Sequence, residues 1–119
     1  MVDGAVLMQM GCLAFVGTRK PENLVHICIN NDAHESVGGM PTGAVGTDYA
    51  KVAAACGYPN VYCTASMEEL EKALEAAKTA NVTTFIEIKV ALSSRENLGR
   101  PKETAIENKN NFMKYHGVR

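Results

Sequence analysis

Residues 24–32 read Leu-Val-His-Ile-Cys-Ile-Asn-Asn-Asp, a short apolar run that ends abruptly in two amides and a carboxylate. A continuous apolar run of this length is typical of an interior strand of a parallel sheet, buried on both faces. We therefore predict a strand from Leu24 to Ile29, with Asn30-Asn31-Asp32 at its carboxyl end.

Helices and strands are predicted to alternate around this strand. The apolar residues from Ala5 to about Val16 favour a buried helix, and a turn follows. Downstream, the pattern predicts a Gly-rich loop over 30–47, a helix from Asp48 to about Cys56 and a strand over 61–64. The next helix begins at the capping residues Ser66 and Glu69, and its buried face is predicted to carry Met67, Leu70, Leu74 and Ala77. A strand over 82–92 and a last helix capped by Thr104 and Glu107 complete the prediction. This order predicts an α/β three-layer sandwich around a parallel sheet. Three strands make a thin sheet, so we expect it to be truncated on its N-terminal side, one strand short.

Composition bounds the class of protein. The chain has 119 residues, 46% of them apolar, and its 12 basic residues nearly balance 13 acidic ones. This describes one globular domain and excludes the basic footprint of a protein that binds nucleic acid or an anionic membrane. The four cysteines form no Cys-x-x-Cys pair and are predicted to be reduced core thiols.

The apolar N-terminal run could be mistaken for the core of a signal peptide. However, Asp3 stands where positive charge is expected, and no Lys or Arg precedes Arg19. The run is also too short to span a bilayer. We therefore predict a cytoplasmic protein that is neither exported nor anchored in a membrane.

Two polar elements are predicted to meet at the carboxyl edge of the sheet: Asp3-Gly4 before the first helix, and Asn30-Asn31 after the next strand. A helix N-terminus offers free N–H groups to a phosphate. Carboxylate and amide oxygens suit a magnesium ion that keeps phosphate ligands. The pattern fits a metal-bridged diphosphate site, but Asn-Asn-Asp at a strand end is also an ordinary turn. Spacing alone leaves both interpretations open.

The same residues resemble the signature of thiamine-diphosphate enzymes, which reads Gly-Asp-Gly, a spacer, then Asn-Asn. Residues 23–42, with Ala-His-Glu-Ser-Val-Gly-Gly at 33–39 followed by Pro41-Thr42, look specifically like the phosphonopyruvate decarboxylases. The resemblance continues through Ser94-Arg95, Leu98-Gly99-Arg100-Pro101 and Ile106-Glu107-Asn108-Lys109 and so covers essentially the whole chain. It implies that residues 1–119 are the C-terminal part of a thiamine-diphosphate-binding domain.

Carried over residue by residue, the resemblance implies that the Asp3 and Asn31 side chains and the Ala33 carbonyl bind magnesium. Gly4 and Ala5 would present N–H groups to the diphosphate. Val2 stands where the family has Gly. Whether Val2 crowds the diphosphate or marks an artificial start of the chain stays open.

The loop that follows carries the candidate catalytic residues. The resemblance places His34 and Glu35, with Ser36, near the thiazolium, where an acid or base could handle the substrate carboxylate. Hydrogen bonding within the loop is the alternative. Arg95 and Arg100 could clamp a phosphonate, although a solvated tail is the more ordinary interpretation.

The implied function is thiamine-diphosphate- and Mg²⁺-dependent decarboxylation of 3-phosphonopyruvate to phosphonoacetaldehyde and CO₂, as part of a longer enzyme. The glutamate that protonates the cofactor's aminopyrimidine would come from a missing N-terminal domain or a partner subunit, and we expect a homo-oligomer. Sulfopyruvate, or another small-molecule 2-oxo acid, is the alternative substrate. A non-catalytic, flavodoxin-like binding module is the alternative from another class.

Overall fold

Three parallel strands form the central layer in a computed structural model that describes residues 1–93, 95–99 and 101–118. They are β1 (Val25–Asn30), β5 (Thr84–Lys89) and β4 (Asn60–Thr64), in the order β1-β5-β4. The central strand is thus β5, whose Glu87 lies between Cys28 of β1 and Cys63 of β4. Beyond β1, Val2 forms an isolated parallel bridge with Ile29, where the expected fourth strand would lie.

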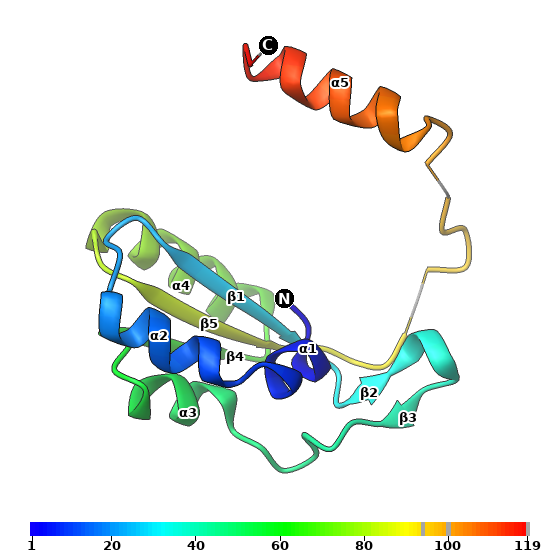
Figure 1. The fold of residues 1–119 in the computed structure, drawn as a ribbon. Helices are drawn as coiled ribbons and strands as arrows, with labels where there is room; N and C mark the ends of the chain where they lie inside the picture. Colours follow the sequence, from blue (N-terminus) through cyan, green and yellow to red (C-terminus); the bar gives the residue numbers. More distant parts are fainter. Residues whose placement is uncertain (94, 100, 119) are drawn as a thin grey trace.

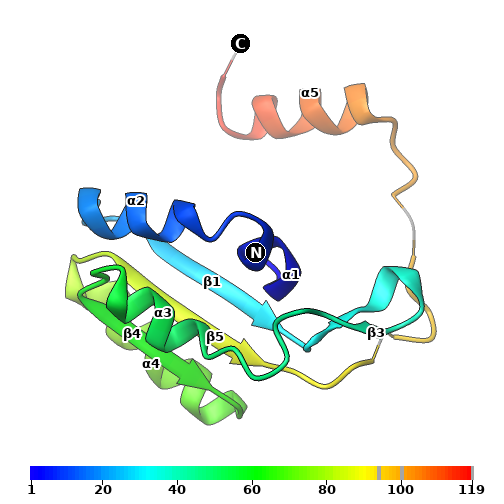
Figure 2. The same cartoon turned by 60° about the horizontal axis from the view of Figure 1, so that its bottom comes forward.

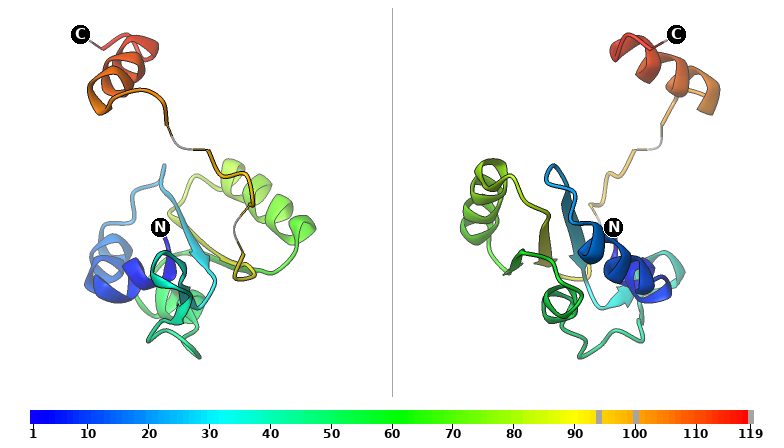
Figure 3. Two further views of the ribbon diagram at one scale, coloured as in Figure 1. Left: turned by 90° about the vertical axis from the view of Figure 1, so that its right-hand side faces the viewer. Right: turned by 60° about the vertical axis from the view of Figure 1, so that its left-hand side comes forward.

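Helices cover both faces of this sheet, which confirms the predicted sandwich. Figure 3 shows α4 (Met67–Ala80) on one side and α1 (Asp3–Met8), α2 (Gly11–Arg19) and α3 (Tyr49–Ala55) on the other. Each side has its own apolar cluster. The α4 side buries Ala73, Ala77 and Ile86, and the opposite side buries Val6, Leu13, Cys28, Ala44, Tyr49, Ala53, Tyr58 and Phe85.

The prediction of one buried helix over 5–16 is wrong. The chain leaves the helical conformation at Gln9 (φ −133°, ψ 43°), so that two short helices, α1 and α2, replace one. The break lets both pack against the sheet, but neither is buried all round: Met8 is 82% and Phe15 64% exposed.

Three further burial predictions are wrong. The strand predicted to be interior and buried on both faces, β1, lies at the edge of the three-stranded sheet, and its residues Val25 and Ile29 are 40% and 44% exposed. Of the four cysteines only Cys28 is buried, because it faces the core from β1, whereas Cys12 and Cys63 are exposed. Met67 is exposed because it begins α4, and the contact with the sheet is made farther along the helix by Ala73 and Ala77.

The predicted helix caps are confirmed. The side chains of Asp48, Ser66 and Thr104 each accept the backbone N–H three residues on. The Gly-rich loop over 30–47 is more ordered than predicted. It contains a small hairpin of β2 (Ala33–His34) and β3 (Met40–Pro41), with a 3₁₀ turn, η1 (Glu35–Val37), between them.

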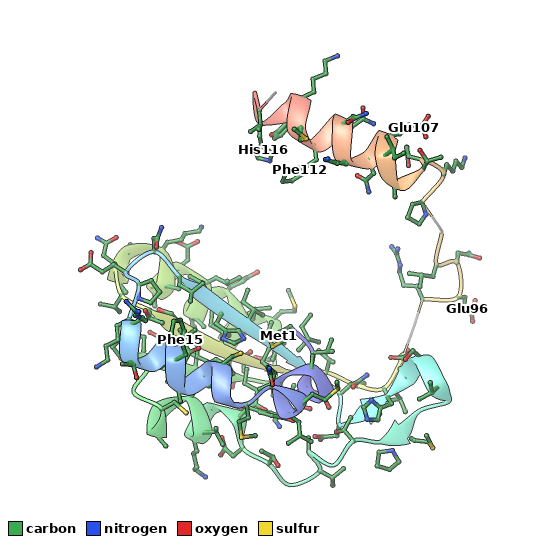
Figure 4. The ribbon with its side chains drawn as sticks, in the orientation of Figure 1. Met1, Phe15, Glu96, Glu107, Phe112 and His116 are labelled. Carbon is green, nitrogen blue, oxygen red and sulfur yellow. The ribbon has the colours of Figure 1, made fainter. Side chains whose placement is uncertain are left out.

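The C-terminal helix α5 (Ala105–Tyr115) stands apart from the sheet and its helices (Figures 1 and 2). None of its residues is buried, and Figure 4 shows Phe112 and His116 clear of the rest of the protein. The radius of gyration is accordingly 16.4 Å, against about 13.5 Å for a compact domain of this length. No helix in the described part of the chain has the length and hydropathy that crossing a bilayer requires.

Close backbone packing between α2 and α3 generates a stability prediction. A Cβ atom on Gly17 would lie 2.0 Å from the carbonyl oxygen of Cys56, whereas one on Gly11 would meet nothing within 4 Å. We expect Gly17→Ala to lower the free energy of unfolding by about 1–3 kcal/mol through overpacking. Gly11→Ala, in the same helix, should leave it unchanged or raise it. Urea unfolding of both variants measures the difference, and equal midpoints would contradict the packing.

Candidate functional site

A cavity of about 260 Å³ opens at the carboxyl edge of the sheet, where β1 ends between α1 and the β2–β3 hairpin (Figure 1). It gathers residues that are far apart in the sequence, from the start of the chain and from the loop after β1. Its lining residues are Val2, Asp3, Gly4, Asn31, Ala33, His34, Glu35 and Ser36. These include every predicted cofactor and catalytic residue except Ala5. Ala5 is exposed in the first turn of α1 and does not line the cavity.

Asp3 is held from two sides. It is the first residue of α1 and only 1% exposed. The Thr42 hydroxyl donates to its Oδ2 atom at 3.0 Å, and the Tyr49 hydroxyl donates to its backbone carbonyl at 3.0 Å. Sequence reasoning missed both partners because they lie in a loop and a helix about forty positions away. The carboxylate is therefore fixed in the wall of the cavity.

The turn after β1 orients the second group of oxygens. The side-chain oxygen of Asn31 accepts the Ala33 N–H at 3.2 Å, and its amide donates to Glu35 at 3.3 Å. Between them Asp32 takes a left-handed conformation (φ 55°), and its Oδ1 atom is buried without a hydrogen-bond partner in the structure. The turn therefore lies in the wall of the cavity, so its formation does not exclude the predicted binding site.

The candidate catalytic residues lie opposite the start of α1. His34 ends β2, Glu35 begins η1, and both are exposed at the cavity. A Cβ atom on Gly4 would lie 3.0 Å from the His34 ring, so the glycine lets the helix backbone approach that ring. The arrangement leaves an imidazole and a carboxylate facing the space above Asp3.

The cavity's chemistry fits a hard cation. Asp3 offers a carboxylate, Asn31 an amide oxygen and Ala33 a carbonyl, which is an oxygen donor set of the kind Mg²⁺ takes. No Lys or Arg is among the lining residues that the structure describes. In the described residues there is no group of three His, Cys, Asp or Glu side chains placed to hold a metal.

Arg95, another candidate, is not among the residues that line the cavity. Arg95 is exposed in the segment after β5, and Arg100 lies outside the described residues. His26, which faces the core from β1, bonds the Tyr58 hydroxyl through Nδ1 at 3.0 Å. Burial lowers its pKa, helped by the charge of the N-terminus, as expected for a core histidine.

Comparison with known proteins identifies the family. Residues 1–88 match the model of the thiamine pyrophosphate enzyme C-terminal TPP binding domain. The chain belongs to this family. Thiamine pyrophosphate is thiamine diphosphate, so the resemblance inferred from Asp3-Gly4 and Asn30-Asn31 is confirmed at the level of the TPP enzymes.

Individual relatives match most of this TPP binding domain. It is 42% identical to a phosphonopyruvate decarboxylase of Streptomyces viridochromogenes over 88% of the chain, and 41% identical to one of Streptomyces hygroscopicus over 84%. A sulfopyruvate decarboxylase subunit beta of Methanococcus maripaludis is 32% identical over 93% of the chain. The chain spans 26% and 25% of the two Streptomyces proteins and 59% of the archaeal subunit.

The buried Tyr49 hydroxyl, which bonds the Asp3 carbonyl, predicts that the folding stability is sensitive to alkaline pH. Burial, with the nearby Asp3 carboxylate, raises the pKa of Tyr49 to about 12, from about 10 in an unfolded chain. The stabilisation is therefore complete below pH 10 and falls as the pH rises toward 12. Tyr49→Phe should cost about 1 kcal/mol at pH 7 through the lost hydrogen bond, yet show a shallower alkaline decline.

Urea midpoints at pH 7, 9, 10 and 11 measure this difference. Tyr115→Phe is the matched control, because Tyr115 is 85% exposed on α5. It should reproduce the unsubstituted protein at every pH. A Tyr49→Phe curve parallel to the control would contradict the assignment.

Proposed function

We propose that the cavity binds the diphosphate of thiamine diphosphate through a magnesium ion held by Asp3, Asn31 and the Ala33 carbonyl. The observation that carries this proposal is the composition of the lining: Asp3 and Glu35 face the cavity and, in the part of the chain that the structure describes, no Lys or Arg side chain does. A diphosphate alone would be repelled there. The start of α1 adds only about half a positive charge, so a divalent ion has to join the two anions.

The cavity's size supports a divided cofactor site. Its volume of about 260 Å³ lies below the range of about 300–1,000 Å³ for sites that enclose a drug-sized ligand. The diphosphate end would fit here, with Gly4 contributing an N–H group of the first turn. The rest of the cofactor, and the glutamate for its aminopyrimidine, would then lie on another domain or a partner subunit, in a homo-oligomer. The name "subunit beta" of two relatives supports such a division.

We propose that the whole protein decarboxylates 3-phosphonopyruvate to phosphonoacetaldehyde and CO₂. When bound, thiamine diphosphate supplies the nucleophilic carbon and the electron sink for loss of CO₂. His34 and Glu35, exposed beside the cavity, would orient the substrate carboxylate and return a proton to the product. The names of the two Streptomyces relatives support this substrate.

The metal-binding proposal predicts that Asp3→Asn abolishes Mg²⁺-dependent binding of thiamine diphosphate, because the only carboxylate proposed as a ligand loses its charge. Calorimetric titration of the complete enzyme with cofactor, at several Mg²⁺ concentrations, measures this. Asp48→Asn is the matched control, since Asp48 carries the same charge at the cap of α3, away from the cavity. Wild-type binding by Asp3→Asn would overturn the site, and magnesium-independent binding would favour a different class of binding module.

The choice of substrate is tested separately on the complete enzyme. Phosphonopyruvate and sulfopyruvate both carry a tetrahedral anionic group at the end remote from the carboxylate. We expect kcat/KM to be higher for phosphonopyruvate, since the relatives of that name have higher identity than the sulfopyruvate subunits. Side-by-side rate measurements decide this, and a clear preference for sulfopyruvate would reverse the assignment.

A further inference from the structure

Glu87 is a fully buried carboxylate in the middle of the sheet, and the proposed chemistry does not use it. It lies on the central strand β5 (Figure 2), on the face covered by α1, α2 and α3. Its Oε1 atom accepts the Asn30 side-chain amide at 2.8 Å and pairs with Lys89 at 2.8 Å. Its Oε2 atom accepts the Ala50 backbone N–H at 3.0 Å. The buried charge of Glu87 is tolerated because each of these three contacting groups donates a hydrogen bond to the carboxylate.

These three donors require a carboxylate. An amide in place of Glu87 would turn an NH₂ group toward at least one of them, leaving two donors facing each other in the core. Ala50 lies in the first turn of α3, so its N–H has no acceptor within the helix. Burial lowers the pKa of Lys89, but the hydrogen bond to Glu87 and the nearby carboxylates of Glu87 and Asp32, with Cys63, together outweigh it, so the pKa of Lys89 is raised.

The contact with Asn30 leads from the sheet into the cavity wall. With its amide committed to Glu87, Asn30 directs Oδ1 to the Asp32 N–H at 3.0 Å. That bond closes the left-handed turn at Asp32, which carries Asn31 and Ala33 on either side. The Asp32 carbonyl accepts the Thr42 N–H at 2.9 Å, and the Thr42 hydroxyl bonds Asp3.

We propose that Glu87 is a positioning residue for the metal site: through Asn30 it fixes the turn that aligns the Asn31 and Ala33 oxygens with the Asp3 carboxylate. The inference rests on the proposed function for the identity of the bound ion. The positioning itself rests on the hydrogen bonds alone. The partners of the Glu87 carboxylate within the described residues are Asn30, the Ala50 N–H and Lys89, and of these three Asn30 leads directly to the turn.

The test is Glu87→Gln in the complete enzyme, with two readouts. Hydrogen–deuterium exchange of residues 30–37, in the absence of cofactor, reports the order of the turn. The Mg²⁺ concentration for half-maximal binding of thiamine diphosphate reports the site. We expect faster exchange and a rise of about tenfold or more in the magnesium midpoint, as for loss of a residue that orients metal ligands.

A matched control separates positioning from general stability. Thr64 is buried next to Glu87 and donates its hydroxyl to the Glu87 backbone carbonyl at 3.1 Å, outside the relay. Thr64→Val should lower the unfolding temperature without changing either readout. The double variant Glu87→Gln with Asn30→Asp exchanges donor and acceptor across the pair. It should restore slow exchange, because the new carboxylate on β1 accepts from the new amide on β5, still accepts the Asp32 N–H, and replaces Glu87 as the negative charge beside Lys89.

The outcomes distinguish the two proposals. Unchanged exchange in Glu87→Gln, or equal effects in Thr64→Val, would overturn the positioning role. Faster exchange with an unchanged magnesium midpoint would overturn the link from the turn to the metal. If Asp3→Asn also leaves that midpoint unchanged, the failure belongs to the proposed metal site rather than to Glu87.

Discussion

The Asn30 side chain makes hydrogen bonds in two directions, and the sheet and the cavity meet through it. Its amide donates to the Glu87 carboxylate inside the core, and its oxygen accepts the N–H of Asp32 in the turn that follows β1. A buried amide with both ends committed has one orientation. The turn after β1 therefore takes its geometry from the packed sheet, and the cavity wall is as well defined as the core behind it.

The rest of the sheet makes that contact possible. β5 lies between β1 and β4, so a residue on it can reach both the strand end at Asn30 and the start of α3 at Ala50. The start of α3 in turn supports the other side of the cavity, because the Tyr49 hydroxyl bonds the Asp3 carbonyl. One central carboxylate thus contacts both the strand end that leads to Asn31 and Ala33 and the helix start that supports Asp3.

How far the sequence predicts this protein depends on how local each feature is. The caps at Asp48, Ser66 and Thr104 and the alternation of strands and helices follow from neighbouring residues, and they were predictable. The bond from Thr42 to Asp3 spans 39 positions and that from Asn30 to Glu87 spans 57, so nothing local marks them. The signal that could have pointed to the second of these bonds was Glu87, which lies among apolar residues in Thr84–Lys89, since a buried charge must have partners.

The negative charge of the cavity lining has a thermodynamic consequence for the proposed cofactor site. Asp3 and Glu35 face the space that the diphosphate would enter, so these carboxylates would repel the diphosphate unless a divalent ion lay between them. Metal and diphosphate then bind with positive coupling, and the factor by which one tightens the other is the same in both directions. The ordered turn at Asp32 adds to the affinity rather than to the coupling, because ligand oxygens already in place need no ordering when the metal arrives.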